Sequence, residues 1–425
     1  MEKRVYSQVG ETLYHGRLEN GLAIYVMPKP AFSQQYAFFA TDYGGADRRF
    51  QLDGTWQDTP AGIAHFLEHK LFDTEKGNAL ADLAANGASP NAFTSAEMTA
   101  YYFTCANGFF DNLRTLLDFV SVPYFTAESV EKEQGIIGQE IGMIEDTPGY
   151  VVYYNLLKCL YAKHPVRDTI AGTVDSIAQI TAETLYNCHH VFYRPSNMVL
   201  CVVGDVDPQR VWEIAEDVLP GGFAPPPIMD YGVEDTLPVA SGRREVTMEV
   251  SQPLFIIGSR GPAGLTGECH LRADLIGSLA AKYLAGKSSP LYLDMYARGL
   301  VTADFSCGFS AGQSFAITEF SGESRSPDEV LDALRAEITG TMKQGIDLPR
   351  FTRLKKAFSG KLIRSLDSAE TLCYEQTAAH FNHANALDRF AVLDSIMPDD
   401  VLGFIKETLN PERLAISVVN GGQVV

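Results

Sequence analysis

Two histidines and a glutamate, close together in the first hundred residues, could bind and use a metal ion. His65, Glu68 and His69 form the pattern H-x-x-E-H. In an α-helix, residues at i and i+4 lie on one face, one turn apart, so both imidazoles can reach a single divalent ion. Glu68 would lie at the edge of that face, where it could take a proton from a water molecule at the metal. The pattern therefore predicts a metal-dependent hydrolytic site.

The residues around this pattern favour a helix over about residues 60–75. Thr59 followed by Pro60 is typical of a helix start, and Phe66 and Leu67 supply an apolar side. Two histidines at this spacing would be poor core filler, because a buried imidazole needs partners for both of its nitrogens. The context therefore favours ligands over a structural pair.

A third ligand is expected from a second element, because zinc hydrolases normally use three protein ligands and leave one position for water. The best candidate helix lies within residues 126–148, where Thr126 can cap the start. Glu133 and Glu140 are seven residues apart, two turns, and point the same way. Carboxylates on an otherwise apolar face are costly unless they meet positive charge. We expect Glu140 as ligand and Glu133 as the residue that orients His69 or Glu140. Glu145 is the alternative ligand, and two histidines with one glutamate favour zinc.

The composition is that of a soluble globular protein of about two domains. The chain has 425 residues, 46% of them hydrophobic and 20% charged. No stretch approaches the length of a membrane span and the start lacks an apolar run, so we expect neither a signal peptide nor a membrane partner. Seven scattered cysteines without a C-x-x-C motif favour reduced thiols and a cytoplasmic protein. The net charge of −19 argues against nucleic acid as a partner.

The order of expected elements repeats along the chain. A strand at 198–203 closes the first half, and the last expected strand, at 413–419, resembles it. The stretch 221–227, rich in Pro and Gly, is typical of a linker. The prediction is an α+β fold of two homologous halves, each a mainly antiparallel sheet backed by helices. The domains expected are a zinc-binding catalytic domain over 1–220, a linker over 221–240 and a zinc-free domain over 241–425.

With these residues the chain resembles the pitrilysin/insulinase family of zinc peptidases, the inverzincins, in its half-size, two-domain bacterial form. The family pattern is H-x-x-E-H followed further along by E-x-x-x-x-x-x-E, which here places His65, Glu68, His69, Glu133 and Glu140. The likeness runs over most of residues 15–210 and is weaker beyond. Other matching stretches are 19–22, 91–95, 164–165, 172–173, 193–197 and 203–205.

The resemblance implies a zinc metalloendopeptidase with one Zn²⁺ per chain that hydrolyses short or unfolded peptides in an enclosed chamber. Glu68 would be the general base acting on a metal-activated water. The segment Asn91, Ala92 and Phe93 would be an exposed strand edge to which the peptide substrate adds as a further strand.

One departure from the family pattern concerns the second half. Complete active sites of the family add an Arg and a Tyr from the zinc-free half. Here Tyr296 occupies the position of the Arg, no Tyr follows Leu300, and Arg298 lies two residues away on another side of its helix. Either a partner chain supplies these groups or the site is slow or specialised. We expect a heterodimer with a zinc-free paralogous subunit, with a homodimer as the alternative.

Two other functions stay open. The chain could be a non-catalytic structural or assembly subunit of the same fold, although such relatives usually lose the H-x-x-E-H that this chain retains. It could also be a hydrolase or lyase that acts on a modified protein side chain. The subgroup that it resembles most is Gram-positive, occurs as pairs of chains with and without the zinc motif, and is associated by name with modification of translation elongation factor P.

Overall fold

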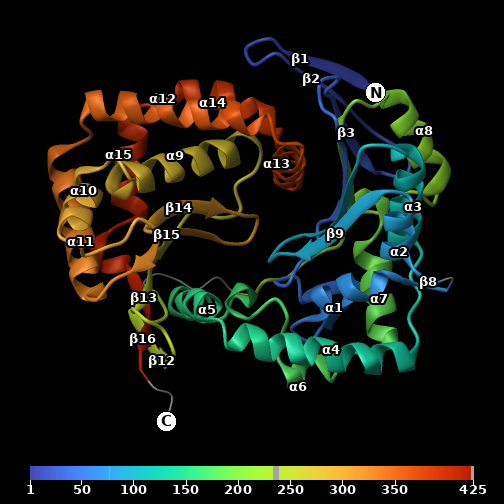
Figure 1. Cartoon of the computed structure of the whole chain (residues 1–425), viewed down its shortest axis with the longest axis horizontal. Helices are drawn as coiled ribbons and strands as arrows, with labels where there is room; N and C mark the ends of the chain where they lie inside the picture. The colour runs from blue at the N-terminus through green and yellow to red at the C-terminus, as the bar shows by residue number, and fades with distance from the viewer. Residues whose placement is uncertain (76, 233–238, 423–425) are drawn as a thin grey trace. The chain divides into compact units, whose positions relative to one another are not determined.

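The chain forms two compact units, each with its own sheet backed by helices (Figure 1). The computed structural model describes residues 1–75, 77–232 and 239–422. The first unit comprises Met1–Ile141, Asp168–Tyr231 and Ile363–Phe381. The second comprises Gly142–Arg167, Gly232–Leu362 and Asn382–Val425. The domain boundaries at 220 and 241 stay a prediction, and residues 233–238 of the expected linker lie outside the described part.

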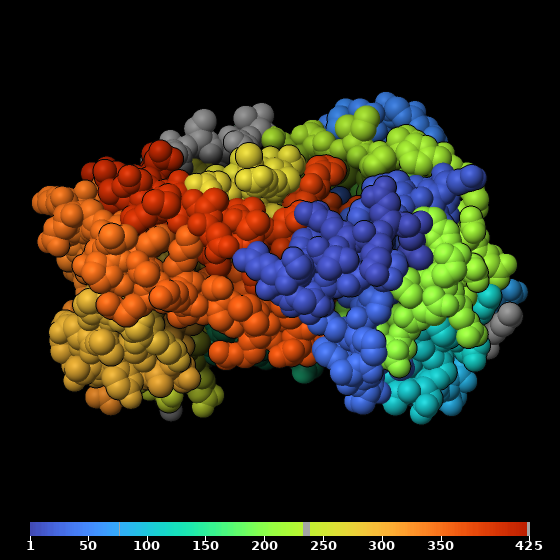
Figure 2. All heavy atoms as spheres, turned by 90° about the horizontal axis from the view of Figure 1, so that it is seen from above, coloured from blue at the N-terminus to red at the C-terminus, as the bar shows by residue number. Residues whose placement is uncertain are grey.

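The first unit is built on a seven-stranded sheet in the order β1-β2-β3-β11-β4-β10-β9. All neighbouring strands are antiparallel except β11 and β3, which are parallel. Every residue of β11 is buried, whereas β9 lies at the sheet edge and the β1 hairpin lies at the surface, dark blue in Figure 2. The strands are β1 (Glu2–Tyr6), β2 (Glu11–Arg17), β3 (Ala23–Pro28), β4 (Gln35–Thr41), β9 (Ala88–Thr94), β10 (Thr99–Cys105) and β11 (Met198–Gly204).

Helices cover both faces of this sheet. Successive residues of a strand point to opposite faces. Tyr101 of β10 packs on Phe72 and Phe119, on the face of α1 and α3, so its neighbour Tyr102 points to the other face. There α13 packs on β11 and β4. The helices of the first unit are α1 (Ile63–Leu71), α2 (Ala79–Ala85), α3 (Phe109–Ser121), α4 (Ala127–Glu145), α6 (Val174–Ile177), α7 (Ala182–Phe192), α8 (Pro208–Val218) and α13 (Ala369–Phe381).

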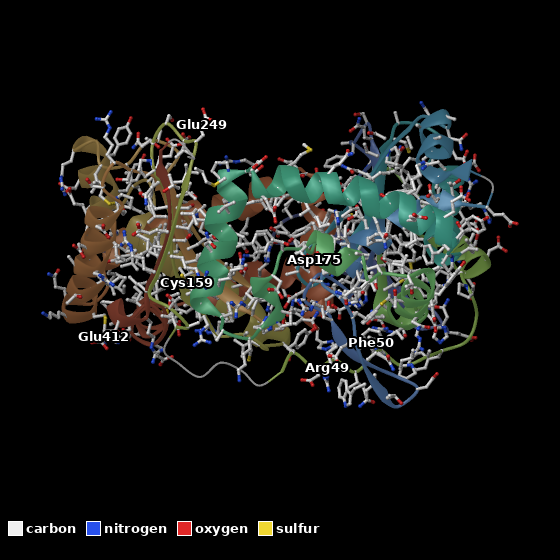
Figure 3. All side chains as sticks on the ribbon, turned by 90° about the horizontal axis from the view of Figure 1, so that it is seen from below. Arg49, Phe50, Cys159, Asp175, Glu249 and Glu412 are labelled. Carbon is white, nitrogen blue, oxygen red and sulfur yellow. The ribbon has the colours of Figure 1, made fainter. Side chains whose placement is uncertain are left out.

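Two small hairpins complete the first unit. Arg49 and Phe50, both labelled in Figure 3, are neighbours on β5: Phe50 is buried, whereas Arg49 pairs with Asp58 and Asp230 at the surface. The hairpin strands are β5 (Arg49–Leu52), β6 (Thr55–Asp58), β7 (Asp73–Thr74) and β8 (Gly77–Asn78).

The second unit repeats the strand order of the first. Its five-stranded sheet runs β12-β16-β13-β15-β14, with one parallel pair, β12 and β16, and antiparallel neighbours beyond it. This matches β3-β11-β4-β10-β9, so the predicted α+β fold of two similar halves is confirmed. The strands are β12 (Arg243–Met248), β13 (Leu254–Arg260), β14 (Ser306–Ala311), β15 (Ala316–Glu323) and β16 (Ala415–Gly421). The helices are α5 (Pro148–Leu160), α9 (Gly267–Ala285), α10 (Pro290–Ala297), α11 (Pro327–Gln344), α12 (Leu348–Ser365), α14 (Arg389–Ser395) and α15 (Pro398–Thr408).

Each unit contains one helix from the half of the chain that mainly builds the other unit. Helix α5 follows the metal-motif segment in sequence but packs on β12, β13 and β16 of the second sheet. Its Cys159, labelled in Figure 3, is fully buried with Sγ 4.0 Å from the Ile416 carbonyl oxygen. Helix α13 lies late in the sequence but belongs to the first unit. No helix among the described residues is long and apolar enough to cross a membrane.

Close packing in the second unit gives a stability prediction. A Cβ at Gly277 of α9 would lie 2.4 Å from ring carbons of Phe309 of β14, whereas a Cβ at Gly360 of α12 would meet no atom within 4 Å. We expect Gly277→Ala to destabilise the protein by about 1–3 kcal/mol through overpacking. Gly360→Ala should stabilise it by about 0.5–1 kcal/mol, because alanine loses less backbone entropy in a helix. Thermal melting followed by circular dichroism measures both, and equal shifts of the same sign would contradict the packing argument.

Candidate metal centre

Helix α1 begins later than the sequence predicts, and a glycine sets its start. Gly62 is the N-cap with φ 95°, a left-handed conformation that Thr59 and Pro60 do not provide. A side chain at Gly62 would also meet the Ala171 carbonyl oxygen at 2.5 Å. Nine helical residues follow, with Phe66 and Leu67 fully buried. The predicted start at residues 59–60 was therefore wrong by one turn, but the helix over H-x-x-E-H is present.

Helix α4 brings the carboxylates of Glu133 and Glu140 close to the histidines of α1. As predicted, Thr126 caps its start, accepting a hydrogen bond at Oγ1 from the Ser129 amide. Val130, Ile137 and Ile141 form the buried side of the helix. The Glu133 side chain beside them is 13% exposed and that of Glu140 is 37% exposed. Glu140 therefore borders solvent, whereas Glu133 is mostly covered.

The structure brings His65, His69 and Glu140 together. Nε2 of His65 lies 3.5 Å from Oε1 of Glu140, and Nε2 of His69 lies 3.7 Å from Oε2. One ligand atom from each residue falls within 4.8 Å of the others. Donor atoms about 2.0–2.1 Å from a tetrahedral zinc lie roughly 3.3–3.4 Å apart. The set therefore fits a zinc ion after only small side-chain adjustments.

Glu133 and Glu145 have different surroundings. Oε1 of Glu133 lies 3.0 Å from Nδ1 of His69, so Nδ1 carries the proton and Nε2 is left to bind. Of the two groups that Glu133 could orient, the geometry thus points to His69. Glu145 is exposed and does not belong to the cluster found among the described residues.

Glu68 is buried beside the three candidate ligands. It is 8% exposed and accepts a hydrogen bond of 2.7 Å from the Thr94 hydroxyl. Burial raises the pKa of the Glu68 carboxyl, and the hydrogen bond opposes that rise in part. Thr94 is absent from the predicted site residues, although it follows directly on Asn91, Ala92 and Phe93. The register of β9 against β10, which pairs Thr94 with Thr99, determines that the Thr94 side chain points toward Glu68.

The two histidines differ in their affinity for protons. Burial, with a smaller contribution from His69, lowers the pKa of His65 to about 4, so His65 is neutral at pH 7 and can donate a lone pair. Burial alone would lower the pKa of His69. Neighbouring carboxylates, led by the hydrogen-bonded Glu133, have the larger opposite effect, so the pKa of His69 lies above its ordinary value. Negative charge is therefore concentrated on the His69 side of the cluster, where a cation would be attracted.

The predicted substrate segment lies on the edge strand β9. Asn91 is exposed, and Ala92 and Phe93 are half-buried. Within the sheet, β9 is hydrogen-bonded to β10 on one side and ends the strand order on the other. Its outer edge therefore has no neighbouring strand among the described residues, and on this strand the Ala92 amide donates to Oδ1 of Asn91 at 2.9 Å.

The position that departs from the family pattern lies in the second unit. Tyr296 of α10 is 51% exposed and stacks on Tyr292 with a centroid distance of 5.7 Å. Arg298 forms ion pairs of 3.2 Å with Asp294 and with Glu329. The nearest arginine to the expected position is thus already paired.

Comparison with known proteins identifies the family. The insulinase pattern (Peptidase family M16) matches residues 53–174, and that of the "Peptidase M16 inactive domain" matches residues 179–358. A Bacillus subtilis protein named "Uncharacterized zinc protease YmfH" is 38% identical over 424 residues, covering 97% of this chain and 98% of its own. The chain belongs to the insulinase family, peptidase family M16. It is a half-size M16 member, as the sequence resemblance indicated.

Solved structures agree with the M16 assignment. The crystal structure of an M16-like protein from Alicyclobacillus acidocaldarius superposes with a TM-score of 0.92 at 34% identity, covering 97% of this chain and 99% of that one. Pitrilysin superposes with a TM-score of 0.76 at 15% identity, covering 98% of this chain and 46% of its own, and shows the fold alone.

Metal content tests the M16 ligand set directly. We expect about one zinc ion per chain in the purified protein, because three donor atoms converge to within small side-chain adjustments of the distances that zinc requires. Glu140→Gln should lose most of the zinc, since it replaces a charged ligand with a neutral amide. The exposed Glu145→Gln is the matched control and should retain it. Elemental analysis measures all three, and zinc lost only from the Glu145 variant would contradict the assignment.

Proposed function

We propose that this chain is a zinc-dependent metallopeptidase that hydrolyses peptide bonds of short or unfolded peptides. The observation that carries the proposal is the cluster of His65, His69 and Glu140 with the buried carboxylate of Glu68 beside it. Family membership and relatives named as zinc proteases support the same reaction class. A structural subunit would have no need for a buried Glu68 carboxylate beside three half-buried metal-ligand side chains, because burying an ionisable group costs free energy.

His65, His69 and Glu140 would hold the ion, and Glu133 would keep His69 in the tautomer that offers Nε2. When bound there, zinc would supply Lewis-acid chemistry, acidifying a coordinated water and polarising the substrate carbonyl. The site combines one neutral histidine with carboxylates, a donor set that suits a divalent cation.

Glu68 would act as the general base and then as the general acid. Its raised pKa makes the carboxylate a better proton acceptor than an exposed glutamate. The Thr94 hydroxyl donates to Oε2 and fixes the carboxyl group, so Oε1 is the atom left to take a proton from the attacking water. The same atom can then deliver that proton to the amine of the leaving peptide.

The substrate would bind to β9 as an added antiparallel strand. Main-chain hydrogen bonds to the outer edge of Asn91, Ala92 and Phe93 would supply affinity without regard to sequence. Thr94 ties this strand to Glu68, so the edge that would hold the peptide and the base that would act on it are part of one hydrogen-bonded assembly.

Replacing the base tests the mechanism. We expect Glu68→Gln to lower kcat for peptide cleavage about a hundred- to ten-thousand-fold, because the amide cannot accept the proton. Its zinc content should stay at the wild-type level, since Glu68 is not among the proposed ligands. Cleavage of a quenched fluorescent peptide beside elemental analysis measures both. An unchanged kcat in a zinc-loaded Glu68 variant would reject the proposed role.

We further propose that a zinc-free paralogous subunit completes the active site in a cytoplasmic heterodimer. Tyr296 stands where the family has an arginine, and Arg298 is held in two ion pairs. All seven cysteines are free and five are buried, which suits a reducing compartment. We expect the zinc-loaded chain alone to cleave peptides weakly and the added paralogue to raise kcat/KM. Full activity from a strict monomer, checked by light scattering, would contradict this prediction.

A further inference from the structure

The sheet face opposite α1 carries a group of aromatic rings beside the edge strand β9. Thr94 points to the α1 side, where it contacts Glu68, so its neighbour Phe93 points to the other face. On that face the Phe93 ring lies 6.2 Å from Tyr102 of β10 and 6.0 Å from Tyr374 of α13, measured between centroids. Tyr374 is 43% exposed and Phe93 and Tyr102 are half-buried. The rings therefore border solvent at the edge where a peptide would add.

A carboxylate of α13 lies on the same helix face as Tyr374 and acts on the Tyr102 ring. Glu370 and Tyr374 are four residues apart on α13, which places them on one face of the helix. Glu370 is exposed and forms no hydrogen bond or ion pair with any described residue. Burial raises the pKa of Tyr102 and the Glu370 carboxylate raises it further, so the charge acts on that ring. We call this set the β9 cluster: Phe93, Tyr102, Tyr374 and Glu370.

We propose that the β9 cluster binds the side chain of a lysine or arginine in a peptide that adds to β9 as a further strand. This rests on the proposed function, because it assumes that β9 receives the substrate. Aromatic faces attract cations, and Arg or Lys can lay its apolar stem on the rings while its charged end meets a carboxylate. The net charge of −19 draws basic peptides to the chain as a whole.

An apolar side chain would fit the cluster less well. A leucine could cover the rings, but it would also displace water from Glu370 and offer no donor in return. An acidic side chain would be repelled by Glu370 and by the carboxylates of Glu97 and Glu375, which, after burial, raise the pKa of Tyr374. The cluster thus discriminates by charge, whereas the β9 backbone does not discriminate at all.

The strand period fixes where the basic residue must stand. In an extended peptide paired with β9, alternate side chains point to the Glu68 side and to the side of the β9 cluster. The residue that enters the cluster is therefore a direct neighbour of one that faces the candidate metal centre. The preference should accordingly appear at one position relative to the cut and be absent from the positions next to it.

Binding by the full-length zinc-loaded Glu68→Gln protein tests the inference without cleavage. Labelled peptides that differ only in one Arg, Leu or Glu are titrated and followed by fluorescence anisotropy. We expect the Arg peptide to bind about five- to ten-fold tighter than the Leu peptide, from one ring contact and one solvent-exposed ion pair. Adding Glu370→Gln or Tyr374→Ala should reduce that preference to about two-fold or less. Asp367→Asn, an exposed acid just before α13, is the charge-matched control and should leave the preference intact.

The outcomes separate the two proposals. An Arg preference that survives Glu370→Gln, an equal affinity for Leu, or no binding of any peptide would overturn the β9 cluster as a basic subsite. Cleavage by the wild-type protein without a Glu370-dependent preference would reject the subsite and leave the peptidase proposal standing. Glu370-dependent binding by a wild-type protein that cleaves nothing, alone or with the paralogue, would reject the peptidase proposal and keep the subsite.

Discussion

The contact between α1 and α4 is the interaction on which the candidate site depends. Each helix brings ionisable groups into a largely buried position, and taking charges out of water costs several kcal/mol per ion unless an opposite charge compensates. Glu133 meets Nδ1 of His69 at 3.0 Å, and Glu140 reaches toward both histidines. The carboxylates of one helix thus compensate the imidazoles of the other, and a divalent cation would compensate the remaining negative charge. The electrostatic attraction that holds the two helices together therefore also arranges the candidate ligands.

Sequence alone predicts the parts of this site that depend on spacing within one helix. In any α-helix, two histidines at i and i+4 lie on one face, and so do two glutamates seven residues apart. The structure places His65, His69, Glu133 and Glu140 in this way. The choice of His69 over Glu140 as the partner of Glu133 depended on how two helices dock. The contact of Thr94 with Glu68 depended on the register of β9 against β10, which the sequence does not specify locally. The late start of α1 depended on the left-handed conformation of Gly62. None of these is encoded within a single short window.

The duplicated fold was predictable in outline, because two similar sequences of strands and helices require two similar sheets. The placement of α5 and α13 was not, since each helix packs on the sheet of the unit that the other half of the chain mainly builds. The five strands of the second sheet follow the order of five strands in the first, yet α1 presents two histidines and a glutamate where α9 presents leucines and alanines. Chemistry in this protein therefore resides in side chains and not in topology, which is why the fold class alone does not identify the function.

Under the proposed mechanism, strand β9 would link catalysis to substrate selection, because successive residues of a strand point to opposite faces of the sheet. Thr94 faces Glu68, the proposed general base, and Phe93 faces the aromatic rings, so a peptide paired with this edge would be contacted from both sides at once. Slipping the peptide by one residue would exchange every side chain between the two faces. Main-chain pairing has no means of preventing that slip, because all residues offer the same backbone groups. A side chain that fits only one face would prevent it, so the proposed subsite on the α13 side would also determine which peptide bond lies at Glu68.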